Sequence, residues 1–382
     1  MSEWKKVPLD KMGVVSRGKS KHRPRNDARL FGGRYPFIQT GDIGAAGLYV
    51  QDYSQTYNEE GLAQSKLWPK DTLCVTIAAN IADTALLAFP ACFPDSIMGF
   101  VPYENVSNVK YVKYCFDILK KDCQQISQGT AQDNLSWKKL STILFPCPPI
   151  EVQNRIVDIL SRYDSLIENY QKQIKLLEEA AQRLYKEWFV DLHFPGHENT
   201  PITDGIPEGW EKKTVGEIAE FKRGKTITKK DIIEGSIPVV AGGLEPAYYC
   251  NKSNTDQRVI TVSGSGANAG FTRMYFEKVW ASDCSFIDCS TTEYLHFIYC
   301  YLIANKSFLD NLQKGAAQPH VYAKDINALV VLVPSHNVIN SFESLASKIF
   351  DVIASKNNQI RNLTEARDRL LPKLMSGEID IV

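Results

Sequence analysis

Two short segments of this sequence concentrate positive charge around a glycine. The triplet Arg-Gly-Lys occupies Arg17–Lys19, after Trp4, and Arg223–Lys225, after Trp210 at the same distance. Guanidinium and ammonium groups form charge-assisted hydrogen bonds with phosphate oxygens, and the resulting affinity falls as salt rises. Each triplet is therefore a candidate phosphate-binding site, with a solvated basic loop as the alternative interpretation.

Further basic side chains surround both triplets. Binding a nucleic acid requires only a local basic face, so the formal net charge of zero, with 44 basic and 44 acidic residues, excludes a polycation but not DNA binding. Thr40 follows the first basic group in a predicted turn. The DNA-binding candidates from these stretches are Arg17, Lys19, Lys21, Arg23, Arg25, Thr40, Arg223 and Lys225.

A glycine-rich stretch, Ser263–Gly270, has the composition of a phosphate loop. It lacks the Gly-Lys-Ser/Thr ending of such loops, and no clear helix follows it, so we do not expect nucleotide binding. Ser263, Ser265 and Asn268 could instead contact DNA from a turn, since an asparagine amide can pair with the edge of adenine. A plain glycine-rich hairpin is an equal alternative.

Motifs for catalysis are missing from the sequence. Cys147–Ile150 lacks the polar first residue and the aromatic of an Asn-Pro-Pro-Tyr methyltransferase motif. His193 and His197 make at most a weak metal site without further ligands, and Cys284 with Cys289 is a poor one. We therefore expect no catalytic residue, cofactor or metal ion in this chain.

The elements that must position these side chains are of two kinds. From about Trp4 to Phe145, short apolar runs alternate with turn signals, which predicts a strand-rich α+β domain with a helix at Tyr111–Leu119. The second half repeats this pattern. The clearest predicted strands are Tyr35–Ile38, Thr72–Ile77, Ile237–Val240 and Arg258–Ser263.

After each predicted domain the apolar residues follow the alternating spacing of four and three that marks a coiled-coil seam. Lys356 and Arg367 interrupt the second seam. We expect the two helices to pack on each other, antiparallel; separate packing of each helix on its own domain is the alternative. The seam includes Ile156, Leu160, Ile167, Ile174, Leu177, Leu184, Phe342, Ile349, Ile353, Ile360, Leu363 and Leu370.

Such helices would act as a spacer. About 40 residues at a rise of 1.5 Å give roughly 60 Å, more than one DNA turn of roughly 34 Å. A second apolar row lies beside the seam, which suggests that another protein docks there. This row comprises Ile159, Leu166 and Ala180 on the first helix and Leu345, Val352 and Ala366 on the second.

The chain thus contains the same unit twice. Gly129–Phe189 returns without a gap as Gly315–Met375, and the fronts of the two copies match more loosely. We predict the following parts: globular domains at residues 1–148 and 210–334, helices at 149–192 and 335–382, and a linker at 193–209. A length of 382 residues with 44% hydrophobic content is sufficient for two cores.

Composition also indicates the compartment. No run of about 18 apolar residues is present, so we expect no membrane span. The first residues lack the apolar segment of a signal peptide, and nine cysteines without Cys-x-x-Cys pairs fit reduced thiols. We expect a cytoplasmic protein.

With these motifs together, the chain resembles the specificity subunit of type I restriction-modification systems over nearly its whole length. The resemblance rests on the duplication, on Gly129–Gln132 with its echo Gly315–Gln318, on Leu184–Phe189 and on Arg369–Ile379. Val262–Gly270 also resembles a recurrent stretch of that family. Ala316 replaces Thr130 in the second copy, which departs from a shared hydroxyl role.

The resemblance implies an α+β fold with two target recognition domains, each followed by a long helix, and an antiparallel coiled coil between the helices. Each domain would read one half of a bipartite double-stranded DNA target, and Thr130, Gln132 and Gln318 join the DNA-binding candidates. Two modification subunits would dock on the helices, and restriction subunits would complete the complex. Alternatives are an orphan or regulatory specificity-like subunit, and a coiled-coil adaptor without DNA readout.

Overall fold

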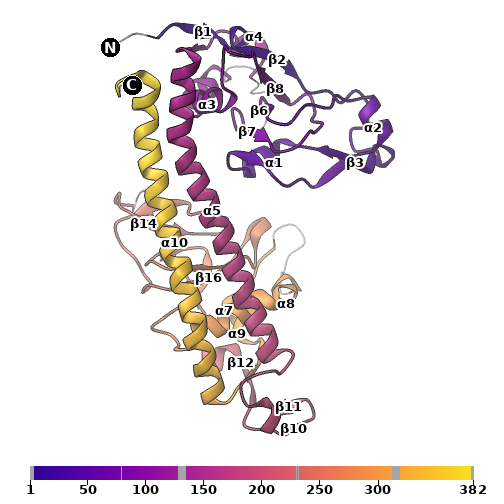
Figure 1. Ribbon diagram of the computed structural model, residues 1–382. Helices are drawn as coiled ribbons and strands as arrows, with labels where there is room; N and C mark the ends of the chain where they lie inside the picture. Colours follow the sequence, from indigo (N-terminus) through magenta and orange to yellow (C-terminus); the bar gives the residue numbers. More distant parts are fainter. Residues whose placement is uncertain are drawn as a thin grey trace. The chain divides into compact units, whose positions relative to one another are not determined.

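The computed structural model describes residues 4–78, 80–127, 135–228, 230, 232–311 and 319–379. The chain divides into two compact units, which are considered separately (Figure 1). Unit 1 comprises Met1–Tyr170 with Gln359–Val382, and unit 2 comprises Gln171–Asn358. Each unit therefore contains one globular domain and part of each of two long helices, α5 (Ile150–Phe189) and α10 (His336–Ser376).

The globular domain of unit 1 is built on a five-stranded sheet in the order β2-β8-β6-β7-β4. Neighbouring strands are antiparallel except β4 and β7, which are parallel. The central strand β6 is apolar and buried along its whole length, as expected for a strand covered on both faces. The sheet strands are β2 (Gly13–Arg17), β4 (Tyr49–Val50), β6 (Leu73–Thr76), β7 (Thr84–Leu87) and β8 (Ile97–Pro102).

Shorter elements complete this domain. The predicted helix is present but longer, as α3 (Val109–Ser127), and its buried face includes Tyr111, Tyr114 and Phe116. The remaining elements are the strand pairs β1 (Lys6–Pro8) with β9 (Leu144–Pro146) and β3 (Phe31–Phe37) with β5 (Gln55–Tyr57), and the short helices α1 (Thr40–Ala45), α2 (Glu59–Ala63) and α4 (Trp137–Leu140).

The globular domain of unit 2 has two smaller sheets in place of the one large sheet of unit 1, in the orders β13-β19-β16-β17 and β15-β14-β18. A further pair joins β12 (Glu211–Thr214) to β20 (Val330–Val333). The sheet strands are β13 (Lys222–Arg223), β14 (Ile237–Val240), β15 (Tyr248–Cys250), β16 (Val259–Ser263), β17 (Thr272–Tyr275), β18 (Trp280–Ala281) and β19 (Cys284–Asp288). The linker pair is β10 (Ile202–Thr203) with β11 (Ile206–Pro207), and the helices are α6 (Val215–Ile218), α7 (Leu295–Ala304), α8 (Lys306–Asn311) and α9 (Ala323–Asn327).

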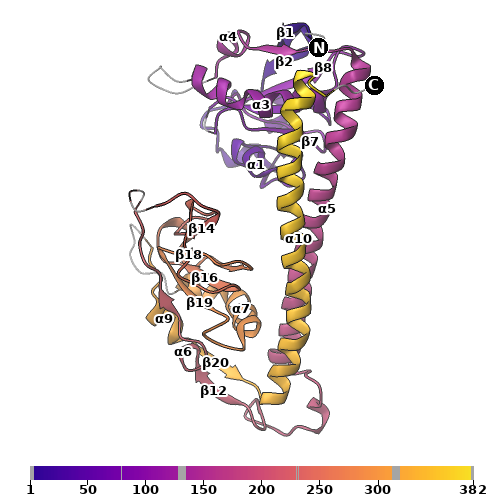
Figure 2. The same ribbon diagram turned by 90° about the vertical axis from the view of Figure 1, so that its left-hand side faces the viewer.

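Helices α5 and α10 lie side by side within each unit (Figures 1 and 2). In unit 1, Ile156 and Leu160 of α5 share one buried core with Leu374 of α10 and with the globular domain. In unit 2, Phe189 of α5 and Phe342 of α10 stack edge to face at 4.9 Å between ring centroids. The early part of one helix meets the late part of the other in both units, so the pairing is antiparallel.

Each helix pair also packs on its own globular domain, so the two expected modes of packing occur together. Burial along the seam is uneven, because Phe342 and Ile353 are buried while Ile167, Ile174 and Ile360 are half-buried. Leu177, Leu184, Ile349, Leu363 and Leu370 are likewise half-buried.

The second apolar row differs from the prediction at one position. Ile159 packs against the core of unit 1, so it is not part of an exposed row. The larger side chains of the row are exposed: Leu166 to 42%, Leu345 to 42% and Val352 to 44%. The counterpart of Ile159 in the second copy is Leu345, which is exposed, so the two copies differ at this position.

Candidate nucleic-acid interface

The Arg-Gly-Lys triplet of unit 2 lies where the chain passes very close to its neighbours. Gly224 donates its N–H to the carbonyl of Cys284 at 2.8 Å, and Lys225 donates to the carbonyl of Ala281 at 2.9 Å. A Cβ on Gly224 would come within 2.3 Å of the Ser282 carbonyl oxygen. Only glycine fits this approach, which leaves the flanking Arg223 and Lys225 side chains exposed.

Unit 1 repeats this geometry. Gly18 donates to the carbonyl of Ile97 at 2.8 Å, and Lys19 donates to the carbonyl of Phe93 at 3.0 Å. A Cβ on Gly18 would lie 2.3 Å from the carbonyl oxygen of Pro94. The same close approach of the backbone at a glycine therefore leaves Arg17 and Lys19 exposed, as it does their counterparts in unit 2.

An aspartate lies beside each basic segment. Asp95 accepts a 2.6 Å hydrogen bond from Arg25, and Arg23 lies 3.9 Å away. In unit 2, Asp283 lies 3.9 Å from Arg223 and accepts a short hydrogen bond from the hydroxyl of Ser265. Asp95 thus holds Arg25 by a hydrogen bond, whereas Arg23 and Arg223 make only long ion pairs and stay exposed. Sequence reasoning did not single them out as site residues, although their recurrence at one offset was a usable signal.

Not every basic residue is available to an outside ligand. Arg29 hydrogen-bonds Asp27 and so holds the pKa of that carboxyl well below its usual range. Arg34 bonds both Tyr35 and Glu59. Within the described residues, by contrast, Arg17, Lys19 and Lys21 make no ion pair, although the backbone N–H of Lys21 donates to Gln64. The cations open to a phosphate are thus concentrated at the start of the segment.

The glycine-rich loop of unit 2 packs beside the triplet. Ser263 is 3% exposed, and its hydroxyl donates to the carbonyl of Gly242. The amide of Asn268 donates to the same carbonyl at 3.4 Å, and Ser265 bonds Asp283. Ser263 and Asn268 therefore brace the loop that contains Gly242, whereas Ser265 bonds the aspartate beside the triplet.

The matching loop of unit 1 follows the same backbone course. Ala82 donates its N–H to the carbonyl of Thr76 at 2.9 Å, as Gly270 does to the carbonyl of Ser263 at 2.9 Å. Both take left-handed backbone angles, with φ of 65° at Ala82 and 84° at Gly270. Thr40 is half-buried at the start of α1, in the position after the N-cap Gln39.

Both loops also hold the segment that follows the repeated tetrapeptide. Leu135 donates to the carbonyl of Ile77 at 2.9 Å, and Val321 donates to the carbonyl of Gly264 at 3.1 Å. The candidates Thr130, Gln132 and Gln318 lie outside the described residues. Next to this contact, a small hollow of about 30 Å³ is lined by Arg223, Asp283, Ser285, His320 and Tyr322, among others. Single-sequence patterns gave no signal for His320 or Tyr322.

No metal-binding cluster of three or more His, Cys, Asp or Glu side chains is found across the described ranges. His193 and His197 lie with ring centroids 5.4 Å apart, and Nδ1 of His197 is 2.9 Å from the carbonyl of Phe194. Cys284 is buried, and burial raises the pKa of its thiol to about 12. Among the described helices, none is both long and apolar enough to span a membrane.

Comparison with known proteins matches these features to one family. The family model described as type I restriction modification DNA specificity domain matches residues 1–179 and again residues 207–363. The chain belongs to this family. The double match follows the duplication, and each match contains one Arg-Gly-Lys triplet and most of one helix.

Individual relatives agree with the family. The type I restriction enzyme MjaIX specificity subunit of Methanocaldococcus jannaschii is 26% identical, over 99% of this chain and 94% of that protein. The EcoprrI specificity subunit of Escherichia coli is 21% identical, over 95% and 92%. The crystal structure of the type I S subunit from M. genitalium matches the fold with a TM-score of 0.60 and 18% identity, over 99% and 97% of the two chains.

Proposed function

We propose that this chain is the DNA sequence-specificity subunit of a type I restriction-modification complex. The observation that carries the proposal is the repeated site: both domains of a twice-matched family present an exposed Arg-Gly-Lys triplet within a basic segment in which an arginine pairs with an aspartate, Arg25 with Asp95 and Arg223 with Asp283. Two similar but non-identical sites on one chain suit a target with two different halves. Each domain would read one half of a bipartite double-stranded DNA sequence.

Different side chains of the site are suited to binding phosphates and to reading bases. Lys19, Lys21 and Lys225 are exposed cations that would bind the phosphate backbone and set position. Arg25 is hydrogen-bonded to a carboxylate and Arg223 lies near one, and an oriented guanidinium can make paired bonds to guanine in the major groove. Asp95 and Asp283 would therefore act as positioning residues for base readout.

The helices would contribute the spacing and the docking surface. Helix α5 has 40 residues and α10 has 41, so each is about 60 Å long. Their exposed residues Leu166, Leu345 and Val352 suit contact with a protein partner. We assign this surface to two modification subunits, which would carry the methyl-transfer chemistry, while restriction subunits join the full complex.

Exchange of one domain tests this proposal directly. Residues 1–145 would be replaced by the matching part of another family member, and the modified DNA motif would be read by methylome sequencing. We expect one half of the motif to change while the other half and the gap stay the same. A change in both halves, or in neither, would contradict the assignment of one half-site to each domain.

A further inference from the structure

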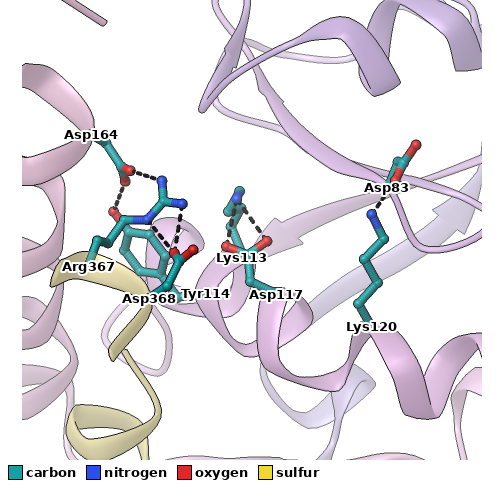
Figure 3. A network of polar contacts seen from close by, with 8 residues as sticks. All are labelled: Asp83, Lys113, Tyr114, Asp117, Lys120, Asp164, Arg367 and Asp368. Carbon is teal, nitrogen blue, oxygen red and sulfur yellow. Dashed lines mark hydrogen bonds and ion pairs between the residues drawn. The ribbon is translucent and has the colours of Figure 1, made fainter. Parts of the chain in front are cut away.

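A polar cluster joins three elements of unit 1: α3, α5 and α10 (Figure 3). Asp164 of α5 accepts a 2.8 Å hydrogen bond from Nη1 of Arg367 on α10 and a 2.5 Å hydrogen bond from the hydroxyl of Tyr114 on α3. The Asp164 side chain is 10% exposed and that of Arg367 is 28% exposed. Arg367, which interrupts the apolar seam, therefore has a specific partner on the facing helix.

The cluster continues along α3. Lys113 bonds Asp117 at 2.7 Å, and Arg367 also bonds Asp368 at 2.9 Å. Burial raises the pKa of Asp117, and it outweighs the lowering effects of Lys113 and, to a smaller extent, of Arg367. Asp117 therefore interacts electrostatically with both Arg367 and Asp164.

The second copy has replaced this cluster with apolar side chains. In the ungapped repeat, Phe350 stands where the first copy has Asp164, and Ala181 stands where the second has Arg367. Both are buried in the core of unit 2. The tyrosine is kept, since Tyr299 of α7 packs edge to face on Phe350 at 5.5 Å, where Tyr114 meets Asp164. The matching stretches Lys113–Phe116 and Ile298–Tyr301 place Ile298 opposite the position of Lys113.

This difference affects which helices can pair. The two helices come from one duplicated sequence, so α5 resembles α10 closely enough that a helix could pair with its own counterpart in a second copy. An antiparallel α5–α5 pair in the same register would place Asp164 against Ala181, and an α10–α10 pair would place Arg367 against Phe350. Either arrangement leaves a mostly buried charge without its partner, which is strongly unfavourable.

We propose that the Asp164–Arg367 pair selects the partner of each helix. It favours pairing of the end of α10 with the start of α5 in the same chain, and it disfavours pairing of either helix with its counterpart in a second copy. Polar pairs at single coiled-coil positions are known to select partners and register at some expense in stability. In unit 2 the buried Phe350 and Ala181 stabilise the packing of the two helices but do not select one partner helix over another. The proposal does not depend on what the globular domains bind.

Reciprocal charge reversal in the full-length chain tests this selection. The Arg367→Asp chain has two acidic partners at the contact, and the Asp164→Arg chain has two basic partners. Each is mismatched within itself, but each complements the other between chains. The two chains, with different affinity tags, would be unfolded in urea and refolded separately and together, and mixed dimers measured by sequential tag capture and light scattering.

We expect the mixture to form at least about tenfold more dimer than either chain alone, because only the mixed dimer satisfies both charges. The single chain Asp164→Arg with Arg367→Asp should refold as wild type does. The control is Glu365→Ala with Arg369→Ala, which removes an exposed ion pair from the same turn of α10 and should form no additional dimer.

Two results would overturn the proposal. One is that both single variants refold as wild type does and the mixture forms no excess dimer. The other is that neither the reversed single chain nor the mixture recovers, which would mean that charge complementarity does not determine pairing. Recovery only in the mixture, even if each variant fails to fold alone, supports the proposal.

Discussion

Gly224 is the position where a single methyl group should disturb a recognition site most clearly. In Gly224→Ala, the new Cβ would lie 2.3 Å from the Ser282 carbonyl oxygen and 2.6 Å from that of Ala281. Both obstacles are backbone atoms, so the triplet segment must move away from its neighbours. The hydrogen bonds from the N–H groups of Gly224 and Lys225, at 2.8 and 2.9 Å, would then be lost.

The expected magnitude follows from these two bonds. A typical backbone hydrogen bond contributes about 1 kcal/mol, so unit 2 should lose about 2 kcal/mol of unfolding free energy. For a unit of this size the loss corresponds to a fall in melting temperature of roughly 4–8 °C. Because Arg223 and Lys225 would be displaced together, affinity for the half-site read by this domain should also fall by about tenfold or more.

The assay combines calorimetry of the purified chain with DNA binding in the presence of its modification partner. Gly243→Ala is the matched control in the same domain, since its Cβ would make an ordinary 3.4 Å contact with the Glu245 carbonyl oxygen. If Gly224→Ala melts within about 1 °C of this control, the close approach does not explain the glycine. If it melts lower but binds DNA normally, the triplet does not contact the target.

Three further predictions concern the phosphates, acidity and the spacer. The double variant Lys19→Ala with Lys21→Ala should weaken binding to every DNA sequence and reduce the salt slope by about one for each lost phosphate contact. The control Arg29→Ala should change neither, because Arg29 is paired with Asp27. Equal effects of the two variants would show that Lys19 and Lys21 are no more available to phosphates than Arg29. Asp288 has a lowered pKa, since hydrogen bonds from Ser290, Asp256 and Thr291 outweigh burial, which alone would raise it. The ionised Asp288 therefore stabilises the folded chain above about pH 3.9, and this stabilisation is lost as the pH falls through the lowered pKa of the folded state. The unfolding free energy of Asp288→Asn should therefore depend less on pH in the acid range. An unchanged dependence of stability on pH would contradict this role of Asp288. Inserting four residues near Gln173 should change the recognised gap in methylome sequencing but leave both half-sites intact, and an unchanged gap would refute the spacer.

The periodic parts of the chain were predictable because their signals are local. The change to coiled-coil spacing after each predicted domain indicated the two long helices, and the strand patterns at Thr72–Ile77 and Ile237–Val240 correspond to β6 and β14. Burial of apolar residues at fixed spacing dominates the energetics of such elements, so the spacing alone indicates the structure.

The polar contacts were not predictable from a single sequence. Arg367 was recognisable only as an interruption of the seam, because its partner Asp164 lies far away in the chain and outside the seam positions. Ser263 was a reasonable DNA contact by composition, yet the structure buries it against Gly242. A side-chain hydrogen bond depends on tertiary placement to within a few tenths of an ångström, and periodicity contains no such information.

The two copies have diverged differently in the candidate DNA sites and in the contacts between the long helices. At the candidate DNA site the shared features are backbone bonds, such as those of Gly18 and Gly224 or of Leu135 and Val321. These bonds join main-chain atoms, so side chains other than those at the two glycines can change without loss of the loop course. In the helix contacts the reverse holds, because the cluster around Asp164 has become apolar around Phe350 while the helices keep their length. Divergence there cannot alter readout directly, but it makes the two ends of the helix pair different. A duplicated chain needs that difference if its halves are to find each other and not the same half of another copy.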